Sequence, residues 1–146
     1  MLREMIKRHE GYRNKPYPCP TGHTTIGYGH NIDANILPSD IATYLKEHGK
    51  ITPEMADTLL DIDIKLADAS CHRIFPKFDE FSENRRAALT DFLFNVGERT
   101  ARTFKNTVSL INQGLWEAAS RNMEKSLWFD QVGNRSREIV GIIKEG

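Results

Sequence analysis

The sequence predicts a mostly helical α+β domain with one small β-rich segment near its start. Apolar residues recur at helical spacing over most of the chain beyond residue 52. The stretch 10–30 instead alternates short extended runs with glycine and proline. At 146 residues the chain has the length of one domain. We therefore expect a single two-lobed domain over 1–146, made of a β-rich lobe (11–52), a connecting helix (53–70) and a helical lobe (71–146 with the helix 1–10).

The first helix is expected to end on an acidic residue. Leu2, Met5 and Ile6 recur at helical spacing, and Gly11 follows as a C-terminal cap, so Glu10 takes the last helical position. A helix C-terminus is electrically negative and disfavours an anion by about 0.3–1 kcal/mol. Stability alone would favour Lys or Arg there, which points to a functional reason for the glutamate.

The following ribbon is predicted to fold as a hairpin. Extended runs at Tyr17–Cys19 and His23–Tyr28 flank Pro20-Thr21-Gly22, a sequence typical of a tight turn. A regular hairpin places Tyr17 opposite Thr25 and Cys19 opposite His23. Alternation then predicts one nearly bare face, open to a large ligand, made of Cys19, Thr25, Gly27 and Gly29. The opposite face would carry Thr24, Ile26, Tyr28 and His30.

The rest of the chain is predicted to be helical. A short helix over Ser39–His48 would begin with Ser39 as its N-cap and end at Gly49. A longer one would follow Thr52-Pro53 and extend to about Ala69. Its predicted apolar stripe is Met55, Leu59, Ile62 and Leu66. A buried helix capped by Ser82 and stopped at Gly97 comes next, and shorter helices are expected at Val108–Asn112, Trp116–Lys125 and Arg135–Lys144.

Composition narrows the class of protein. The 20 basic and 20 acidic residues balance, so no net field favours nucleic acid, and we expect no nucleic-acid partner. The two cysteines are too few for a disulfide framework and are expected to be thiols. No apolar run is long enough to span a membrane, and the chain starts directly on its first helix without a signal peptide, so we expect no membrane insertion.

Glu10 is followed after eight residues by Cys19, and Cys19 after five residues by Thr25 and Ile-Gly-Tyr-Gly-His. This N-terminal motif resembles the phage lysozyme family, the glycoside hydrolase family 24 endolysins. The resemblance continues in order along nearly the whole chain, through Arg85–Leu89, Phe94–Glu98, Thr103–Thr107, Trp116–Ala119, Lys125–Trp128 and Asn134-Arg135. It implies a lysozyme-like fold and cleavage of the β-1,4 bond between N-acetylmuramic acid and N-acetylglucosamine in bacterial peptidoglycan.

The resemblance also implies catalytic roles. Glu10 would be the general acid, and Cys19 with Thr25 would position or activate water, with inversion at the anomeric carbon. Cys19 is a departure, because many members carry Asp there. Since an ordinary cysteine has a pKa of about 8.5, only a few per cent is thiolate at pH 7. Cys19 could be a thiolate base, a polarisable prop beside Thr25, a nucleophile that attacks the sugar, or a small apolar filler of the turn.

Further residues match family positions. His30 and Asp63 are expected to form an ion pair that ties the ribbon to the long helix. Arg135 resembles the arginine that approaches the catalytic glutamate, and is otherwise a surface arginine near a helix start. Residues expected to line or support the substrate cleft, each of which could alternatively be plain core or surface, are Asn31, Phe94, Asn95, Thr107, Asn122 and Trp128.

As a family member the protein is expected to act as a monomer on bacterial peptidoglycan without a cofactor or a metal. It would accumulate in the host bacterial cytoplasm and reach the wall after a separate holin-type protein permeabilises the inner membrane. Rival functions are a cysteine amidase or peptidase with Cys19 as nucleophile and His23 or His30 as base, and a wall-binding module with a degenerate site. A metal site at Cys19, His23 and His30 matches no usual ligand spacing.

Overall fold

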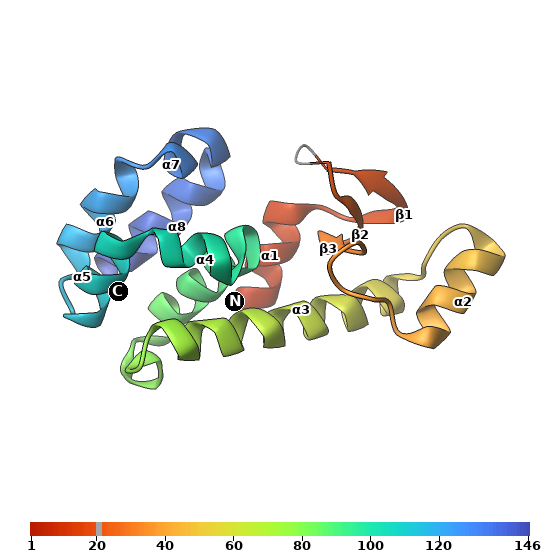
Figure 1. Ribbon diagram of the computed structural model, residues 1–146, viewed down its shortest axis with the longest axis horizontal. Helices are drawn as coiled ribbons and strands as arrows, with labels where there is room; N and C mark the ends of the chain where they lie inside the picture. Colours follow the sequence, from red (N-terminus) through yellow and green to blue (C-terminus); the bar gives the residue numbers. More distant parts are fainter. Residues whose placement is uncertain (20–21) are drawn as a thin grey trace. The chain divides into compact units, whose positions relative to one another are not determined.

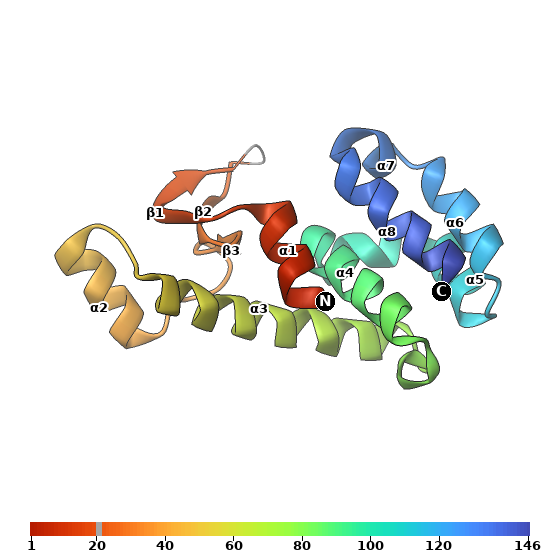
Figure 2. The same ribbon diagram turned by 180° about the vertical axis from the view of Figure 1, so that it is seen from behind.

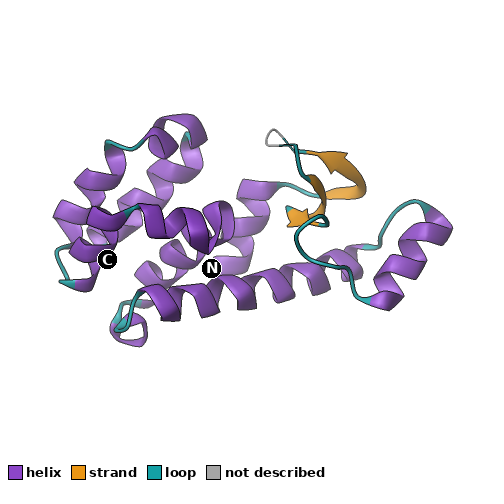
Figure 3. Ribbon diagram, viewed as in Figure 1, coloured by secondary structure: helices purple, strands orange, loops and turns teal. Residues whose placement is uncertain are grey.

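The computed structural model describes residues 1–19 and 22–146. It confirms the α+β class: helices account for most of these residues, and the strands lie between residues 13 and 31 (Figure 1, Figure 3). The elements in chain order are α1 (Leu2–Glu10), β1 (Arg13–Pro18), β2 (Thr24–Gly27), β3 (His30–Asn31), α2 (Ser39–His48), α3 (Pro53–Ile74), the 3-10 helix η1 (Phe78–Glu80), α4 (Glu83–Thr103), α5 (Lys105–Asn112), α6 (Trp116–Glu124), α7 (Leu127–Val132) and α8 (Asn134–Glu145).

The chain divides into two compact units. We call Arg3–Ile64 the N-terminal unit, and Lys65–Gly146 with Met1–Leu2 the C-terminal unit. The N-terminal unit holds α1 beyond its first residue, the three strands, α2 and the first half of α3; the C-terminal unit holds the remaining helices (Figure 2). This division groups α1 with the strands, whereas the sequence analysis grouped it with the helical lobe.

Helix α1 ends where its sequence predicts. Glu10 is its last residue, and Gly11 adopts a positive φ of 73°, the left-handed conformation that glycine takes at a C-cap. The Gly11 N–H donates to the Lys7 carbonyl at 2.9 Å and closes the last turn. On α3 of the same unit, the Asp57 carboxylate pairs with Lys7 at 3.0 Å and with Arg3 at 3.5 Å. These contacts fix the helix that carries Glu10.

The sheet is antiparallel with strand order β1-β2-β3. Tyr17 lies opposite Thr25, as predicted. The Cys19 N–H donates to the His23 carbonyl at 2.8 Å, which continues the pairing to the end of the hairpin. The predicted turn residues Pro20 and Thr21 lie outside the described residues.

The register of the hairpin is irregular between Arg13 and Tyr17. Pro16 lies in this stretch and has no N–H to donate to a ladder. The carbonyl of Asn14 instead accepts the N–H of Ile51 at 2.9 Å, which ties β1 to the segment before α3.

One side of β2 departs from the predicted alternation. Gly27 has a positive φ of 67°, and a Cβ there would meet the Ala56 Cβ at 3.5 Å and the Ile51 Cδ1 at 3.7 Å. The prediction that Gly27 belongs to a bare, open face is therefore wrong, because positive φ turns the chain out of the extended geometry that alternation assumes. The apolar core of the unit consists of Ile26, Ile41, Ile51, Ala56 and Leu59.

Helix α2 spans the predicted Ser39–His48 and ends at Gly49, which has a φ of 74°. The prediction that Ser39 is its N-cap is wrong. Pro38 takes the cap position, without a capping side-chain bond, so Ser39 is already helical. Helix α3 begins as predicted, with the Thr52 Oγ1 accepting the Met55 N–H at 3.2 Å. It runs past the predicted end at Ala69 to Ile74.

The predicted apolar stripe of α3 is wrong at Leu66, which is 50% exposed. Met55 and Ile62 are only half-buried. The prediction counted large apolar residues and overlooked small ones, whereas the buried side includes alanine and cysteine. Its apolar members are Ala56, Leu59, Leu60, Ala67, Cys71 and Ile74.

The C-terminal unit is built around α4. The Ser82 Oγ accepts the Arg85 N–H at 3.1 Å, as predicted for its N-cap. The regular helix stops at Gly97, also as predicted, where φ is 81° and ψ is 161°. A second helical segment then continues to Thr103, and neither that segment, nor η1, nor α7 was predicted. Around α4 packs a core that includes Phe75, Phe78, Leu89, Phe92, Ile111, Met123 and Ile139.

Among the described residues, no helix combines the length and the apolar character needed to cross a membrane. Both cysteines are thiols, as predicted. Cys71 is fully buried in the C-terminal unit, and burial raises its pKa to about 12. Its thiol therefore stays protonated and behaves as a small apolar core residue.

Candidate active site

The side chain of Glu10 packs against the backbone of Gly29. Gly29 lies in the turn between β2 and β3 with a φ of 77°, and a Cβ placed there would lie 2.7 Å from the Glu10 Cδ and would also clash with its Oε1. Any side chain at residue 29 would therefore displace the carboxyl group. The lack of a side chain at Gly29 leaves room for this carboxyl. The sequence analysis instead predicted that the space beside Gly29 is open to a large ligand.

The other two predicted catalytic residues lie on the hairpin of the same unit. Thr25 is 6% exposed, and its hydroxyl donates to the Tyr17 carbonyl at 3.2 Å. The hydroxyl proton is thus committed to the backbone, and the oxygen keeps a lone pair for a water molecule. Cys19 is half-buried, at the hairpin end just after β1.

His30 and Asp63 are in direct contact. The His30 Nδ1 lies 2.8 Å from the Asp63 Oδ2, and the His30 Nε2 lies 3.1 Å from the Asn35 carbonyl oxygen. His30 is only 2% exposed. Burial by itself lowers its pKa, but the hydrogen bond and charge of Asp63, helped by the Asn35 carbonyl, raise the pKa above its usual value. Both acceptors are satisfied together only by the protonated imidazole.

We expect Asp63→Asn to lower the free energy of unfolding more at pH 6 than at pH 9. A pKa raised in the folded state gives stability that is complete below the unfolded value near 6.5 and is lost as pH rises through the folded value. The expected loss at pH 6 is about 1–3 kcal/mol, measured by urea unfolding at both pH values.

Asp61→Asn is the matched control for this measurement. Asp61 lies on the same helix and pairs with Arg3, which does not change charge between pH 6 and pH 9. Its loss should be small and equal at the two pH values. Equal losses for Asp63→Asn as well would refute the role of the His30 charge.

Arg135 is held by a buried carboxylate that the sequence analysis missed. The Arg135 Nε donates to the Asp91 Oδ1 at 2.7 Å, and Asp91 is fully buried in the middle of α4. A signal was present, because Asp91 is the one acid inside the otherwise uncharged run Ala87–Phe94, and a buried acid needs a partner.

The remaining predicted site residues make local contacts. The Trp128 Nε1 donates to the Asn95 Oδ1 at 2.8 Å, and the Thr107 hydroxyl donates to the Asn122 Oδ1 at 2.6 Å. Trp128 is 9% exposed, and its ring packs edge-on against Phe92.

Two further predicted residues make other contacts, each within its own unit. Phe94 is half-buried against the C-terminal core. The Asn31 Oδ1 accepts the Ala34 N–H at 3.1 Å, so this side chain shapes its own loop. The structure thus brings the predicted residues together as Asn95 with Trp128, Thr107 with Asn122, and His30 with Asp63.

Comparison with known proteins shows the family. The model of the family described as phage lysozyme matches residues 7–144. The chain belongs to the phage lysozyme family. The match includes Glu10, Cys19 and Thr25, and it confirms the family that the N-terminal motif resembles.

Relatives across the phage lysozyme family cover nearly the whole chain. "Probable T4-type lysozyme 2" of Dictyostelium discoideum is 27% identical over 160 residues, which covers 99% of this chain and 94% of that protein. An "Endolysin" of Acyrthosiphon pisum secondary endosymbiont phage 1 is 31% identical over 141 residues, covering 96% and 86%. The "Pre-baseplate central spike protein Gp5" of Enterobacteria phage T4 is 28% identical over 159 residues, covering 99% of this chain and 28% of that protein.

Proposed function

We propose that this protein is a peptidoglycan hydrolase that cleaves the β-1,4 bond between N-acetylmuramic acid and N-acetylglucosamine. Membership of the phage lysozyme family supports the class of enzyme. A relative from Pseudomonas phage phiKMV that is named "Peptidoglycan hydrolase gp36" supports the substrate. The observation that carries the proposal is the Glu10 carboxyl at the end of α1, held against the Gly29 backbone in the unit that also bears Cys19 and Thr25.

In the proposed mechanism Glu10 donates its proton to the glycosidic oxygen as the bond breaks. A water molecule attacks the anomeric carbon from the opposite face and inverts its configuration. The Thr25 Oγ1 orients this water by accepting a hydrogen bond from it, since the Thr25 hydroxyl proton is donated to the Tyr17 carbonyl. The proton that the attacking water releases goes to Cys19 when it is a thiolate, or to bulk solvent when Cys19 is only a polarisable neighbour.

Further parts of the proposal rest on family membership. Residues proposed to bind or support the glycan are Asn31, Phe94, Asn95, Thr107, Asn122, Trp128 and Arg135, while His30 and Asp63 support the N-terminal unit. We propose that the enzyme acts as a monomer, is made in the host cytoplasm, and reaches the wall through a separate holin-type protein.

The test is to digest purified cell walls and score new reducing ends against new amino groups. Reducing ends with an inverted first-formed anomer in proton NMR are the expected result. Cys19→Ala should retain measurable activity, because Glu10 and Thr25 remain. If wild type releases amino groups and only Cys19→Ala loses this release, the enzyme is an amidase instead. If the first-formed product keeps the anomeric configuration, the reaction passes through a covalent glycosyl-enzyme intermediate and not through direct attack by water.

A further inference from the structure

A small pocket in the C-terminal unit lies outside the candidate active site. Its volume is about 250 Å³, and it is lined by Ile74 at the end of α3, by Arg102 near the end of α4, and by Lys105, Val108 and Ser109 of α5. None of these residues is among those proposed for catalysis or glycan binding. The pocket therefore needs a separate explanation.

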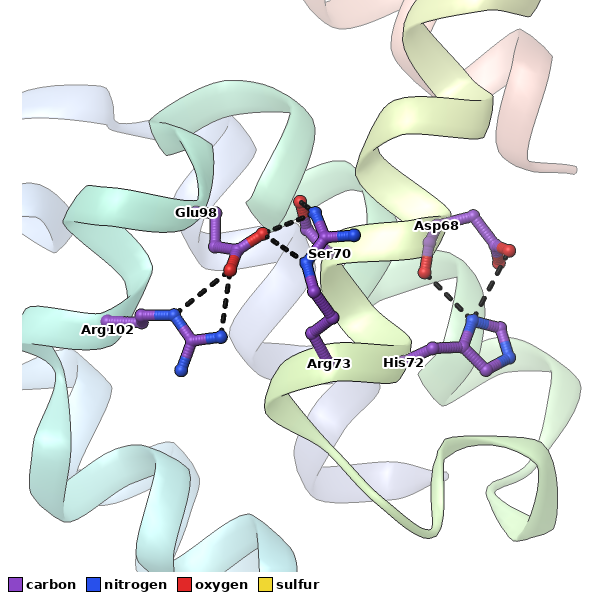
Figure 4. Close-up of polar contacts among 6 residues, drawn as sticks. All are labelled: Asp68, Ser70, His72, Arg73, Glu98 and Arg102. Atoms are coloured by element: carbon purple, nitrogen blue, oxygen red, sulfur yellow. Dashed lines mark hydrogen bonds and ion pairs between the residues drawn. The ribbon is translucent and has the colours of Figure 1, made fainter.

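Glu98 holds one wall of the pocket in place. Its Oε2 accepts hydrogen bonds from the Arg102 Nε at 3.0 Å and Nη2 at 2.8 Å, and its Oε1 accepts from the Arg73 Nε at 2.9 Å. Figure 4 shows the carboxylate between the two guanidinium groups. Hydrogen bonds from Arg73 and Arg102 lower the pKa of Glu98 to about 2, so the Glu98 carboxylate stays charged at any working pH. The Arg102 guanidinium is thus held in place beside the pocket.

The polar groups of the pocket are donors. Among the described residues, neither the Arg102 Nη1 nor the Lys105 Nζ has an acceptor within hydrogen-bond reach. The Ser109 Oγ accepts from the Gln113 Nε2 at 3.0 Å, which leaves its proton to be donated. A guanidinium, an ammonium and a hydroxyl around one hollow suit an anion with several acceptor oxygens.

The remaining lining is apolar and limits the size of the ligand. Ile74 is 5% exposed, and Val108 is half-buried against the core. A volume of about 250 Å³ is below the usual range for drug-sized ligands, which starts near 300 Å³. The hollow therefore suits a carboxylate that carries a small alkyl group, such as the C-terminal alanine of a short peptide.

We propose that this pocket binds the free carboxylate end of a wall stem peptide that terminates in alanine. The proposal rests on the proposed function, because the substrate proposed above carries short peptides with carboxylate ends. The carboxylate would accept from Arg102, Lys105 and Ser109, and the alanine methyl would contact Ile74 and Val108. The site would hold the enzyme on its polymer away from the catalytic residues.

The experiment is an NMR or calorimetric titration with N-acetyl-D-alanyl-D-alanine, its C-terminal amide and inorganic phosphate. The free acid should bind, and the amide should bind about tenfold more weakly, since it loses a charge-assisted hydrogen bond. Lys105→Gln and Arg102→Gln should each weaken binding about tenfold. Arg121→Gln is the matched control, because Arg121 is also an exposed arginine paired four residues away, with Glu117, and it should bind like wild type.

Several results would overturn the proposal: equal binding of acid and amide, phosphate binding as tight as the acid, or an equal loss in Arg121→Gln. If Arg102→Gln fails to fold, Lys105→Gln still decides, because Lys105 is exposed. Binding is read without turnover, so Glu10→Gln should titrate like wild type. If the enzyme hydrolyses walls but binds no peptide, the proposed peptide site is refuted and the proposed function stands. If it binds the peptide but does not hydrolyse walls, the proposed function is refuted and the peptide site stands.

Discussion

Glu10→Gln is expected to lower the rate of wall hydrolysis by about 10²–10⁴-fold while leaving the fold intact. Glutamine keeps the shape of the side chain but has no acidic proton for the leaving oxygen, and general acid catalysis contributes on that scale. The rate is measured as new reducing ends from purified walls, with circular dichroism and the unfolding midpoint to confirm the fold. A Glu10→Gln enzyme within tenfold of wild type would refute the proposed acid.

Gly29→Ala tests the placement of the same carboxyl without changing its chemistry. A Cβ at residue 29 would lie 2.7 Å from the Glu10 Cδ, so the carboxyl must move. A displacement of about 1 Å can cost on the order of 10²-fold in rate. Gly11→Ala is the matched control, because Gly11 has a similar φ of 73° but nothing within 4 Å of its Cβ position. The two variants carry similar backbone strain, and only Gly29→Ala should lose most of its activity.

The ends of several helices were predictable because their determinants are local. A glycine with positive φ or a capping hydroxyl acts within a few residues of itself. The ends of α1 at Glu10, of α2 at His48 and of the regular part of α4 at Gly97 agree with the sequence for this reason. The catalytic candidates lie within 10–25, a stretch governed by such signals.

Burial was less predictable, because it depends on what packs against an element. On α3 the large residue Leu66 faces solvent, while the small residues Ala67 and Cys71 are buried. The prediction chose the side of α3 that carries the larger apolar residues, although helical spacing is equally compatible with the side that carries Ala67 and Cys71. Gly27 shows the same limit on β2: its positive φ and its contact with Ala56 come from the packing of the unit, and alternation alone gives no sign of either.

Polar partners that lie far apart in sequence were the part of the site that was hardest to predict. His30 and Asp63 were paired only through the family resemblance, because 33 residues separate them. The Asp91 partner of Arg135 is 44 residues away and was missed, although an acid within an apolar helix is itself a signal. Such a residue can be flagged from sequence as needing a partner, but only the fold identifies which one.

Asp91→Ala is expected to lower the free energy of unfolding by about 3–5 kcal/mol. Asp91 is fully buried and Arg135 is 8% exposed, so removing the carboxylate leaves a buried guanidinium without this partner. Urea unfolding at pH 7 measures the loss. The control Glu117→Ala removes the carboxylate of an exposed pair with Arg121 and should cost less than about 1 kcal/mol. Because the charge left behind causes the damage, the double variant Asp91→Leu/Arg135→Met should recover much of the stability. A double variant as unstable as Asp91→Ala would show instead that the shape of the site, and not its charge, requires the pair.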